Sequence, residues 1–240
     1  MKKIVLSTAI FLLVSFQMQS QWFFGGKKGN GILVTETRNV NDYDKIIVTG
    51  AFDVALIYGK EGELHIKMEE NLVEYLITEV KDDKLIIRWK NGISINTKKG
   101  VHIVVPFKDL DKVSLTGSGD IISNDLIKAE HFETLVSGSG DVVLNIEANS
   151  ITSKVTGSGD IELLGNTDTL YTIVTGSGDF KSYKLNAKNV EARVTGSGDV
   201  KVLALDKLTA RVTGSGDIEY RGEPKFEDFK ITGSGDIEKE

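Results

Sequence analysis

The chain has 240 residues, of which 40% are hydrophobic, 27% charged and 8% aromatic, a composition typical of a folded globular protein and unlike that of a disordered or collagenous chain. Its net charge of −6 disfavours a nucleic-acid partner, because such binding depends on clustered basic side chains. The absence of cysteine excludes disulfides, thiolate metal sites, cysteine nucleophiles and a bacterial lipoprotein anchor.

Residues 1–20 have the pattern of a secretory signal peptide. Lys2 and Lys3 precede an apolar run over residues 4–16, and the small residue Ser20 stands just before the expected cleavage site. The run is shorter than the roughly 20 residues of a spanning helix, so a retained membrane anchor is the less favoured alternative. We therefore expect an exported mature chain from Gln21 without a transmembrane segment, located in the periplasm, on the outer surface or in the medium.

Residues 21–30 are predicted to form a flexible leader, whose aromatic trio Trp22, Phe23 and Phe24 has no docking site indicated by the sequence. Alternating apolar and polar residues then predict strands within residues 44–58, 63–68, 84–89 and 100–106. Residues 71–80 are compatible with one short helix or a bulge. Residues 48–54 resemble a degenerate copy of the repeat that follows, which indicates that coiled structure begins there.

The tetrapeptide Gly-Ser-Gly-Asp occurs seven times in residues 107–240, and successive copies are separated by 18 to 21 residues. Apolar residues alternate with polar ones around each copy, which is the two-residue period of a β-strand. This alternation turns both glycines inward and the Thr, Ser and Asp side chains outward. A pair of inward glycines predicts either close approach of the opposite wall or a bend in the strand, and the sequence leaves both alternatives open.

A unit of about 19 residues cannot bury its apolar face alone, whereas stacked units with strands ~4.8 Å apart share one core. The repeat therefore predicts an all-β fold, a single-stranded parallel β-helix or β-solenoid, and the preference of parallel crossovers makes it right-handed. We expect one elongated domain over residues 31–240, with an irregular N-terminal β cap over 31–106 and regular coils over 107–240. The charged tail 238–240 discourages edge pairing at the other end.

Three features together resemble the head GIN domain family of putative auto-transporter adhesins. They are the segment Tyr43-Asp44-Lys45-Ile46-Ile47-Val48-Thr49-Gly50, the step Val104-Val105-Pro106, and the Gly-Ser-Gly-Asp series, and the resemblance covers residues 31–240. It implies an exported bacterial protein with a β-solenoid fold and no established activity. No barrel-forming translocator follows in the sequence, so self-transport through an outer membrane is not expected.

Stacking of the coils turns the outward residues into three columns of Thr, Ser and Asp. The simplest interpretation is structural, because Thr favours strands and an Asp after Gly accepts backbone N–H bonds. Adjacent carboxylates repel by roughly 1 kcal/mol in water, so the choice of Asp over Asn also suggests Ca²⁺ binding, although the spacing matches no known calcium loop. The candidate metal ligands are Asp120, Asp141, Asp160, Asp179, Asp199, Asp217 and Asp236.

The same columns form a regular hydroxyl-rich face that could bind a glycan or a surface protein, and ice is a weaker alternative. The candidate ligand-binding ladder comprises Thr156, Ser158, Asp160, Thr175, Ser177, Asp179, Thr195, Ser197 and Asp199.

No catalytic arrangement is apparent, because His65, His102 and His131 are dispersed and the repeated carboxylates are equivalent, whereas glycosidases need two carboxylates in different environments. The sequence therefore predicts a non-enzymatic binding module of the envelope or surface, with no cofactor unless the Asp residues bind calcium. The alternatives are a purely structural envelope spacer and, less favoured, a carbohydrate-active enzyme. The oligomeric state is not indicated.

Overall fold

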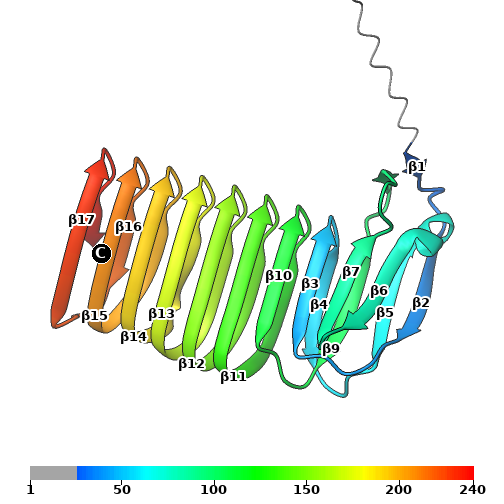
Figure 1. Cartoon of the computed structure of the whole chain (residues 1–240), viewed down its shortest axis with the longest axis horizontal. Coiled ribbons are helices and arrows are strands. Elements are labelled where there is room, and N and C mark those ends of the chain that lie inside the picture. Colours follow the sequence, from blue (N-terminus) through cyan, green and yellow to red (C-terminus); the bar gives the residue numbers. More distant parts are fainter. Residues whose placement is uncertain (1–25) are drawn as a thin grey trace, which may run out of the picture.

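The computed structural model describes residues 26–240, which form an elongated stack of β-coils with a more irregular N-terminal end (Figure 1). The predicted signal peptide and the aromatic trio Trp22–Phe24 lie outside the described residues. Among residues 26–240, no helix is long and apolar enough to cross a membrane.

The regular part of the molecule is a β-solenoid, as predicted. Each long strand pairs in parallel with the equivalent strand of the next coil, so that Val142 lies beside Ile161 and Gly157 beside Gly176. Each long strand also folds over a second corner midway along its length, opposite the glycine corner (Figure 1). The strands are β10 (Lys112–Gly117), β11 (Ile121–Gly138), β12 (Val142–Gly157), β13 (Ile161–Gly176), β14 (Phe180–Gly196), β15 (Val200–Gly214), β16 (Ile218–Arg221), β17 (Phe226–Gly233) and β18 (Ile237–Lys239).

The chain bends at each Gly-Ser-Gly-Asp copy, which decides between the two alternatives for the glycine pair. Gly157 has a φ of +116°, and a Cβ on it would lie 2.4 Å from the carbonyl oxygen of Gly138 in the preceding coil. A Cβ on Gly159 would lie 2.1 Å from the carbonyl oxygen of Gly140. Glycine is therefore required because the backbone of the neighbouring coil, and not the opposite wall, occupies the space of the side chain.

The core lies between the two faces of the coils. Val155, Ile161 and Leu163 are fully buried, as the alternation predicts, and one connected apolar cluster extends from Tyr43 to Tyr220. The core also contains three hydroxyls on successive coils, Thr134, Ser153 and Thr172, which lie side by side in register. None of the three has a hydrogen-bond partner in the described part of the chain.

The N-terminal part contains the predicted strands, but several of them pair antiparallel instead of forming coils. β5 pairs antiparallel with both β2 and β9, and β6 pairs antiparallel with β7, whereas β3 and β4 continue the parallel sheets of the solenoid. The 3-10 helix η1 and β6 occupy the segment predicted as a short helix or bulge. The elements are β1 (Lys27–Lys28), β2 (Leu33–Asn39), β3 (Lys45–Gly50), β4 (Asp53–Tyr58), β5 (Glu63–Glu69), η1 (Glu70–Tyr75), β6 (Leu76–Lys81), β7 (Lys84–Trp89), β8 (Ile95–Asn96) and β9 (His102–Phe107).

Residues 26–30, expected as part of a flexible leader, instead belong to the folded cap. β1 pairs with β8, and Gly29 is buried against the carboxylate of Glu69. This fully buried carboxylate accepts hydrogen bonds from the backbone N–H groups of Gly31 (2.7 Å) and Lys98 (2.8 Å). A buried charge with two amide donors is well satisfied, so Glu69 ties the start of the described chain to the cap.

The degenerate copy at residues 48–54 is the first corner of the solenoid, as predicted. Gly50 pairs in register with Gly117, while Phe52 stands where later coils have their second glycine. The ring of Phe52 is fully buried and packs 5.0 Å from that of Trp89 on β7. A side chain fits here because the neighbouring strand on the cap side, β7, contributes the ring of Trp89 and not the backbone of another glycine corner.

Candidate functional site

The glycine corners lie in line along one edge of the solenoid and present two columns of hydroxyls. All members of both columns are exposed, and none of their hydroxyls takes part in a side-chain hydrogen bond within residues 26–240. The Thr column consists of Thr116, Ser137, Thr156, Thr175, Thr195, Thr213 and Thr232, and the Ser column consists of Ser118, Ser139, Ser158, Ser177, Ser197, Ser215 and Ser234.

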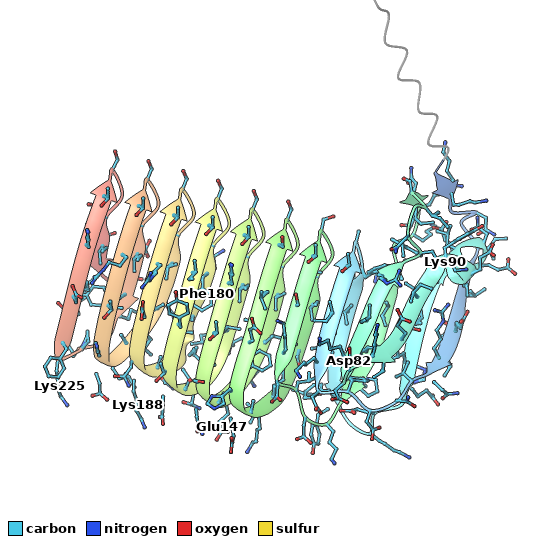
Figure 2. All side chains as sticks on the ribbon, viewed as in Figure 1. Asp82, Lys90, Glu147, Phe180, Lys188 and Lys225 are labelled. Carbon is cyan, nitrogen blue, oxygen red and sulfur yellow. The ribbon has the colours of Figure 1, made fainter. Side chains whose placement is uncertain are left out.

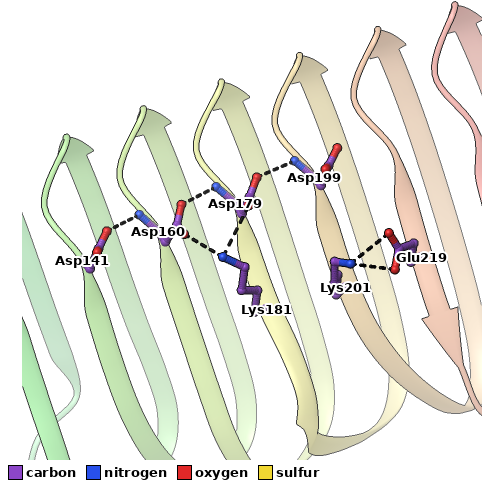
Figure 3. A network of polar contacts seen from close by, with 7 residues as sticks. All are labelled: Asp141, Asp160, Asp179, Lys181, Asp199, Lys201 and Glu219. Carbon is purple, nitrogen blue, oxygen red and sulfur yellow. Dashed lines mark hydrogen bonds and ion pairs between the residues drawn. The ribbon is translucent and has the colours of Figure 1, made fainter.

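The Asp column, formed by the seven candidate metal ligands, differs from the hydroxyl columns because its carboxylates are bonded between coils. The backbone N–H of Asp179 donates to Oδ1 of Asp160 at 2.9 Å, and the N–H of Asp199 donates to Oδ1 of Asp179 at 3.0 Å (Figure 3). The same contact recurs at every step from Asp120 to Asp236, with distances from 2.8 to 3.3 Å. Each carboxylate from Asp120 to Asp217 therefore satisfies an amide of the next coil that the turn leaves outside the strand ladder.

Two lysines lie beside the Asp column on the face that follows the glycine corner (Figure 3). Lys181 Nζ lies 2.7 Å from Oδ2 of Asp160 and 3.4 Å from Oδ2 of Asp179. Its hydrogen bond to Asp160 raises the pKa of Lys181, and a bond to Glu219 likewise raises the pKa of Lys201. The sequence analysis missed both residues, although their outward position two residues after an Asp was a usable signal.

The calcium interpretation of the Asp column stays a prediction. The bonds between coils leave Oδ2 as the second oxygen of each carboxylate, and Lys181 contacts two of these oxygens. Among the residues that the structure describes, no group of three or more His, Asp or Glu side chains is arranged to hold a metal ion.

The second corner of the coils forms a groove that the sequence analysis did not identify as a candidate site. Its volume is about 690 Å³, and its floor includes the small residues Ala148 and Thr167. Asn186 Nδ2 donates to Oδ1 of Asn166 at 2.9 Å across adjacent coils. Figure 2 shows Glu147 and Lys188 at this edge, opposite the glycine corners. The remaining lining residues are Lys128, Ala129, Glu130, Asn149, Asp168 and Leu205.

The histidines remain dispersed in the structure. His65 lies 3.5 Å from Glu63, His102 lies 3.2 Å from Asp53, and His131 Nδ1 lies 2.6 Å from Ser150 Oγ, each on a different strand. The fold does not bring the three imidazoles together, and each has a partner within its own strand or on the adjacent one.

The coil architecture and the corner motif agree with a known protein family. Residues 42–224 match the family described as "Putative auto-transporter adhesin, head GIN domain". The chain belongs to this family. The head GIN match includes the degenerate first corner and six of the seven Gly-Ser-Gly-Asp copies.

Several solved structures of other bacterial proteins have the same fold. A putative adhesin from Bacteroides fragilis is 23% identical, with a TM-score of 0.83, covering 90% of this chain and 100% of that one. A putative lipid binding protein from Parabacteroides distasonis is 30% identical, with a TM-score of 0.75 and coverage of 89% and 99%. A putative adhesin from the same species is 26% identical, with a TM-score of 0.72 and the same coverage. No functionally curated protein is significantly similar to the chain.

Proposed function

We propose that this head GIN protein is an exported, non-enzymatic adhesion module of the cell envelope or surface, and that its Thr and Ser columns contact a glycan or a protein partner. The observation that supports the proposal is that the Asp column and the hydroxyl columns differ in their hydrogen bonding at the glycine corner. The Asp carboxylates are engaged between coils, whereas the hydroxyls beside them are exposed and free of side-chain hydrogen bonds within residues 26–240.

Exposed hydroxyls suit this role for a physical reason. Each hydroxyl both donates and accepts a hydrogen bond, and removing it from water costs far less than removing a charge. Because the columns repeat at the strand spacing of ~4.8 Å, a polymer or an extended chain along the edge meets equivalent groups on successive coils. Several weak contacts then act together, which raises the affinity for a repetitive ligand above that for its single unit.

The alternative of a purely structural spacer also has a specific basis, because the Asp ladder links each coil to the next. The two proposals differ in what the hydroxyl columns do. In a spacer, bulky substitutions at the exposed Ser column leave every interaction of the protein unchanged. In an adhesion module, the same substitutions abolish binding.

The test is binding of the purified protein to a glycan array, to bacterial and host cell surfaces and to lipid vesicles. One triple variant carries Arg at Ser158, Ser177 and Ser197, and a matched control carries Arg at Asn149, Asn166 and Asn186 on the second corner. We expect binding that the first variant loses and the control keeps. Loss only in the control moves the site to the groove, and the absence of wild-type binding to any of these surfaces contradicts the adhesion proposal.

A further inference from the structure

The two ends of the solenoid are finished differently. At the C-terminal end, β17 pairs with β15 along one edge, and within residues 26–240 no strand pairs with its other edge. Figure 1 shows β17 as the outermost strand of the stack. At the N-terminal end, the guanidinium of Arg38 donates to the carbonyl oxygens of Leu76 (2.7 Å) and Val73 (2.8 Å), so polar groups at the start of β6 are already satisfied.

On its inner face, β17 carries apolar side chains at positions that are buried in the preceding coil, but here no further coil covers them. Phe229 lies in register with Ala210 and Ile231 with Val212, and these two residues of the preceding coil are buried. Phe229 is nevertheless 37% exposed and Ile231 44% exposed, and Phe226 on the outer face is 69% exposed. Exposed apolar side chains on an unpaired edge strand are typical of an interaction surface.

The backbone at this end has the same pattern as an internal coil. In the preceding corner, the Gly214 carbonyl oxygen accepts from the N–H groups of Ser234 (2.8 Å) and Gly235 (3.2 Å). The last corner repeats the motif in full, but its own Gly233 carbonyl and Asp236 carboxylate receive no such donors within the described chain. The last corner, which follows β17, therefore carries backbone and carboxylate acceptors at positions where every earlier Gly-Ser-Gly-Asp corner accepts hydrogen bonds from the next coil.

The other half of the last coil is protected, as the charged tail predicts. On β18, Lys239 pairs with Glu223 at 2.7 Å, and Glu240 after it pairs with Arg221 at 2.5 Å. These ion pairs surround the edge of β18 with charge, which discourages strand addition. The unprotected edge is confined to β17.

We propose that β17 is a self-association surface through which two copies of the chain pair antiparallel, end to end, about a twofold axis. In an antiparallel register centred on Phe229, the outer face of β17 brings opposite charges together. In that register the two Phe229 rings meet, and each Lys230 faces Asp228 of the partner subunit. Because the twofold axis is perpendicular to the sheet, the inner faces of both copies stay on the same side, where the paired Phe229 rings are flanked by Ile231 of each copy facing Glu227 of the partner subunit.

The alternating charges of Asp228 and Lys230 on β17 favour a second copy of the chain over other binding partners. The Asp228 carboxylate pairs with Arg211 of the preceding strand, and its side chain is still 63% exposed, so Lys230 of the partner subunit can reach it. A parallel head-to-tail stack would instead have to pair β17 with the N-terminal end, where Arg38 occupies backbone acceptors and β2 presents polar side chains. The interface is therefore isologous and closes as a dimer instead of growing into a filament.

The first test is the oligomeric state of the purified protein by sedimentation velocity. We expect a dimer in the wild type and a monomer in Ile231→Glu, because the new carboxylate faces Glu227 of the partner subunit, and like charges directly opposite each other destabilise strand pairing. Ile122→Glu is the matched control, since Ile122 on β11 is 45% exposed but lies in the middle of the solenoid, and it should remain a dimer. A monomeric wild type, or a dimer that Ile231→Glu leaves intact, overturns the proposal.

The second test reports the register. The chain has no cysteine, so Phe229→Cys introduces one thiol per copy, and two such residues facing each other form a disulfide on mild oxidation. We expect a covalent dimer from Phe229→Cys and none from Ile122→Cys. A folded Phe229→Cys protein that stays uncrosslinked overturns the antiparallel register. Neither test uses the hydroxyl columns, so failure here is separate from failure of the adhesion proposal.

Discussion

Replacement of Asp199 by alanine is the sharpest test of the Asp ladder. Asp199 Oδ1 accepts the backbone N–H of Asp217 at 2.9 Å, and the side chain is half-buried. A hydrogen bond to a charged group contributes about 1.5–3 kcal/mol, and partial access of water to the amide reduces the loss. We therefore expect Asp199→Ala to lower the free energy of unfolding by about 1–2 kcal/mol. Asp199→Asn keeps an oxygen acceptor and should recover about half of that loss.

The assay combines thermal unfolding with hydrogen exchange. For a chain of this size, 1 kcal/mol corresponds to about 2–4 °C in Tm, so Asp199→Ala should melt several degrees below the wild type. Exchange of the Asp217 amide should accelerate in the same variant. Ser197→Ala is the matched control, because this exposed neighbour has no side-chain hydrogen bond within residues 26–240, and its Tm should not change. Equal Tm values for Asp199→Ala and Ser197→Ala, or equal losses for Ala and Asn at position 199, would refute the reasoning.

Four further predictions follow from the corner, the core, the last coil and the carboxylates. Gly178→Ala places a Cβ 2.0 Å from the carbonyl oxygen of Gly159 and should lower the free energy of unfolding by at least about 1–3 kcal/mol. Gly59→Ala is the control, because its Cβ meets nothing within 4 Å, and it should leave the urea midpoint unchanged. Equal midpoints for the two variants contradict the tight corner. Thr172→Val removes a buried hydroxyl that has no partner within residues 26–240 and should raise the free energy of unfolding by about 1 kcal/mol, and a decrease would indicate an unseen partner. Hydrogen bonds to Arg211 and Arg221 lower the pKa values of Asp228 and Glu240, respectively. Their contribution to stability is therefore present at neutral pH and is lost as the pH falls through the lowered values. As the pH falls below about 4, hydrogen exchange should accelerate at the β17 amides before it accelerates at those of β13. If the Asp column binds calcium at ~10 μM, ~1 mM Ca²⁺ should stabilise the fold by roughly 2.7 kcal/mol over chelator, and a Tm that Ca²⁺ does not move would contradict the calcium interpretation.

The coil architecture was predictable because one local signal, apolar alternation with a period of two, recurs at a fixed interval. Val155 and Ile161 flank one corner, and apolar residues flank the other corners at equivalent places, so that stacking of the coils buries them together as columns. The position of the bend was not predictable from that signal. Gly157 and Gly159 fit the alternation of a straight strand as well as that of a corner, and only the carbonyls of the neighbouring coil distinguish the two.

The cap and the site details depended on contacts that have no sequence period. The antiparallel pairing of β2 with β5 and the burial of Glu69 join residues that are far apart in the chain, and neither repeats elsewhere. The role of the Asp column was foreseen only as one alternative among three, because a carboxylate that accepts an amide and one that binds a cation look the same in a sequence. Lys181 and its neighbour Lys201 were missed since they occur at the same place in only two coils and lack the sevenfold repetition that drew attention to the columns.

The stacking of coils also determines how this protein responds to tension. The described N-terminal end and the C-terminus lie at opposite ends of the long axis (Figure 1), so a force between them pulls across the strands and not along them. The hydrogen bonds of one coil then open together, before those of the next, and each opened coil of about 19 residues releases roughly 65 Å of chain. Extension should therefore proceed in nearly equal steps, so the chain can lengthen under tension while its remaining coils stay folded.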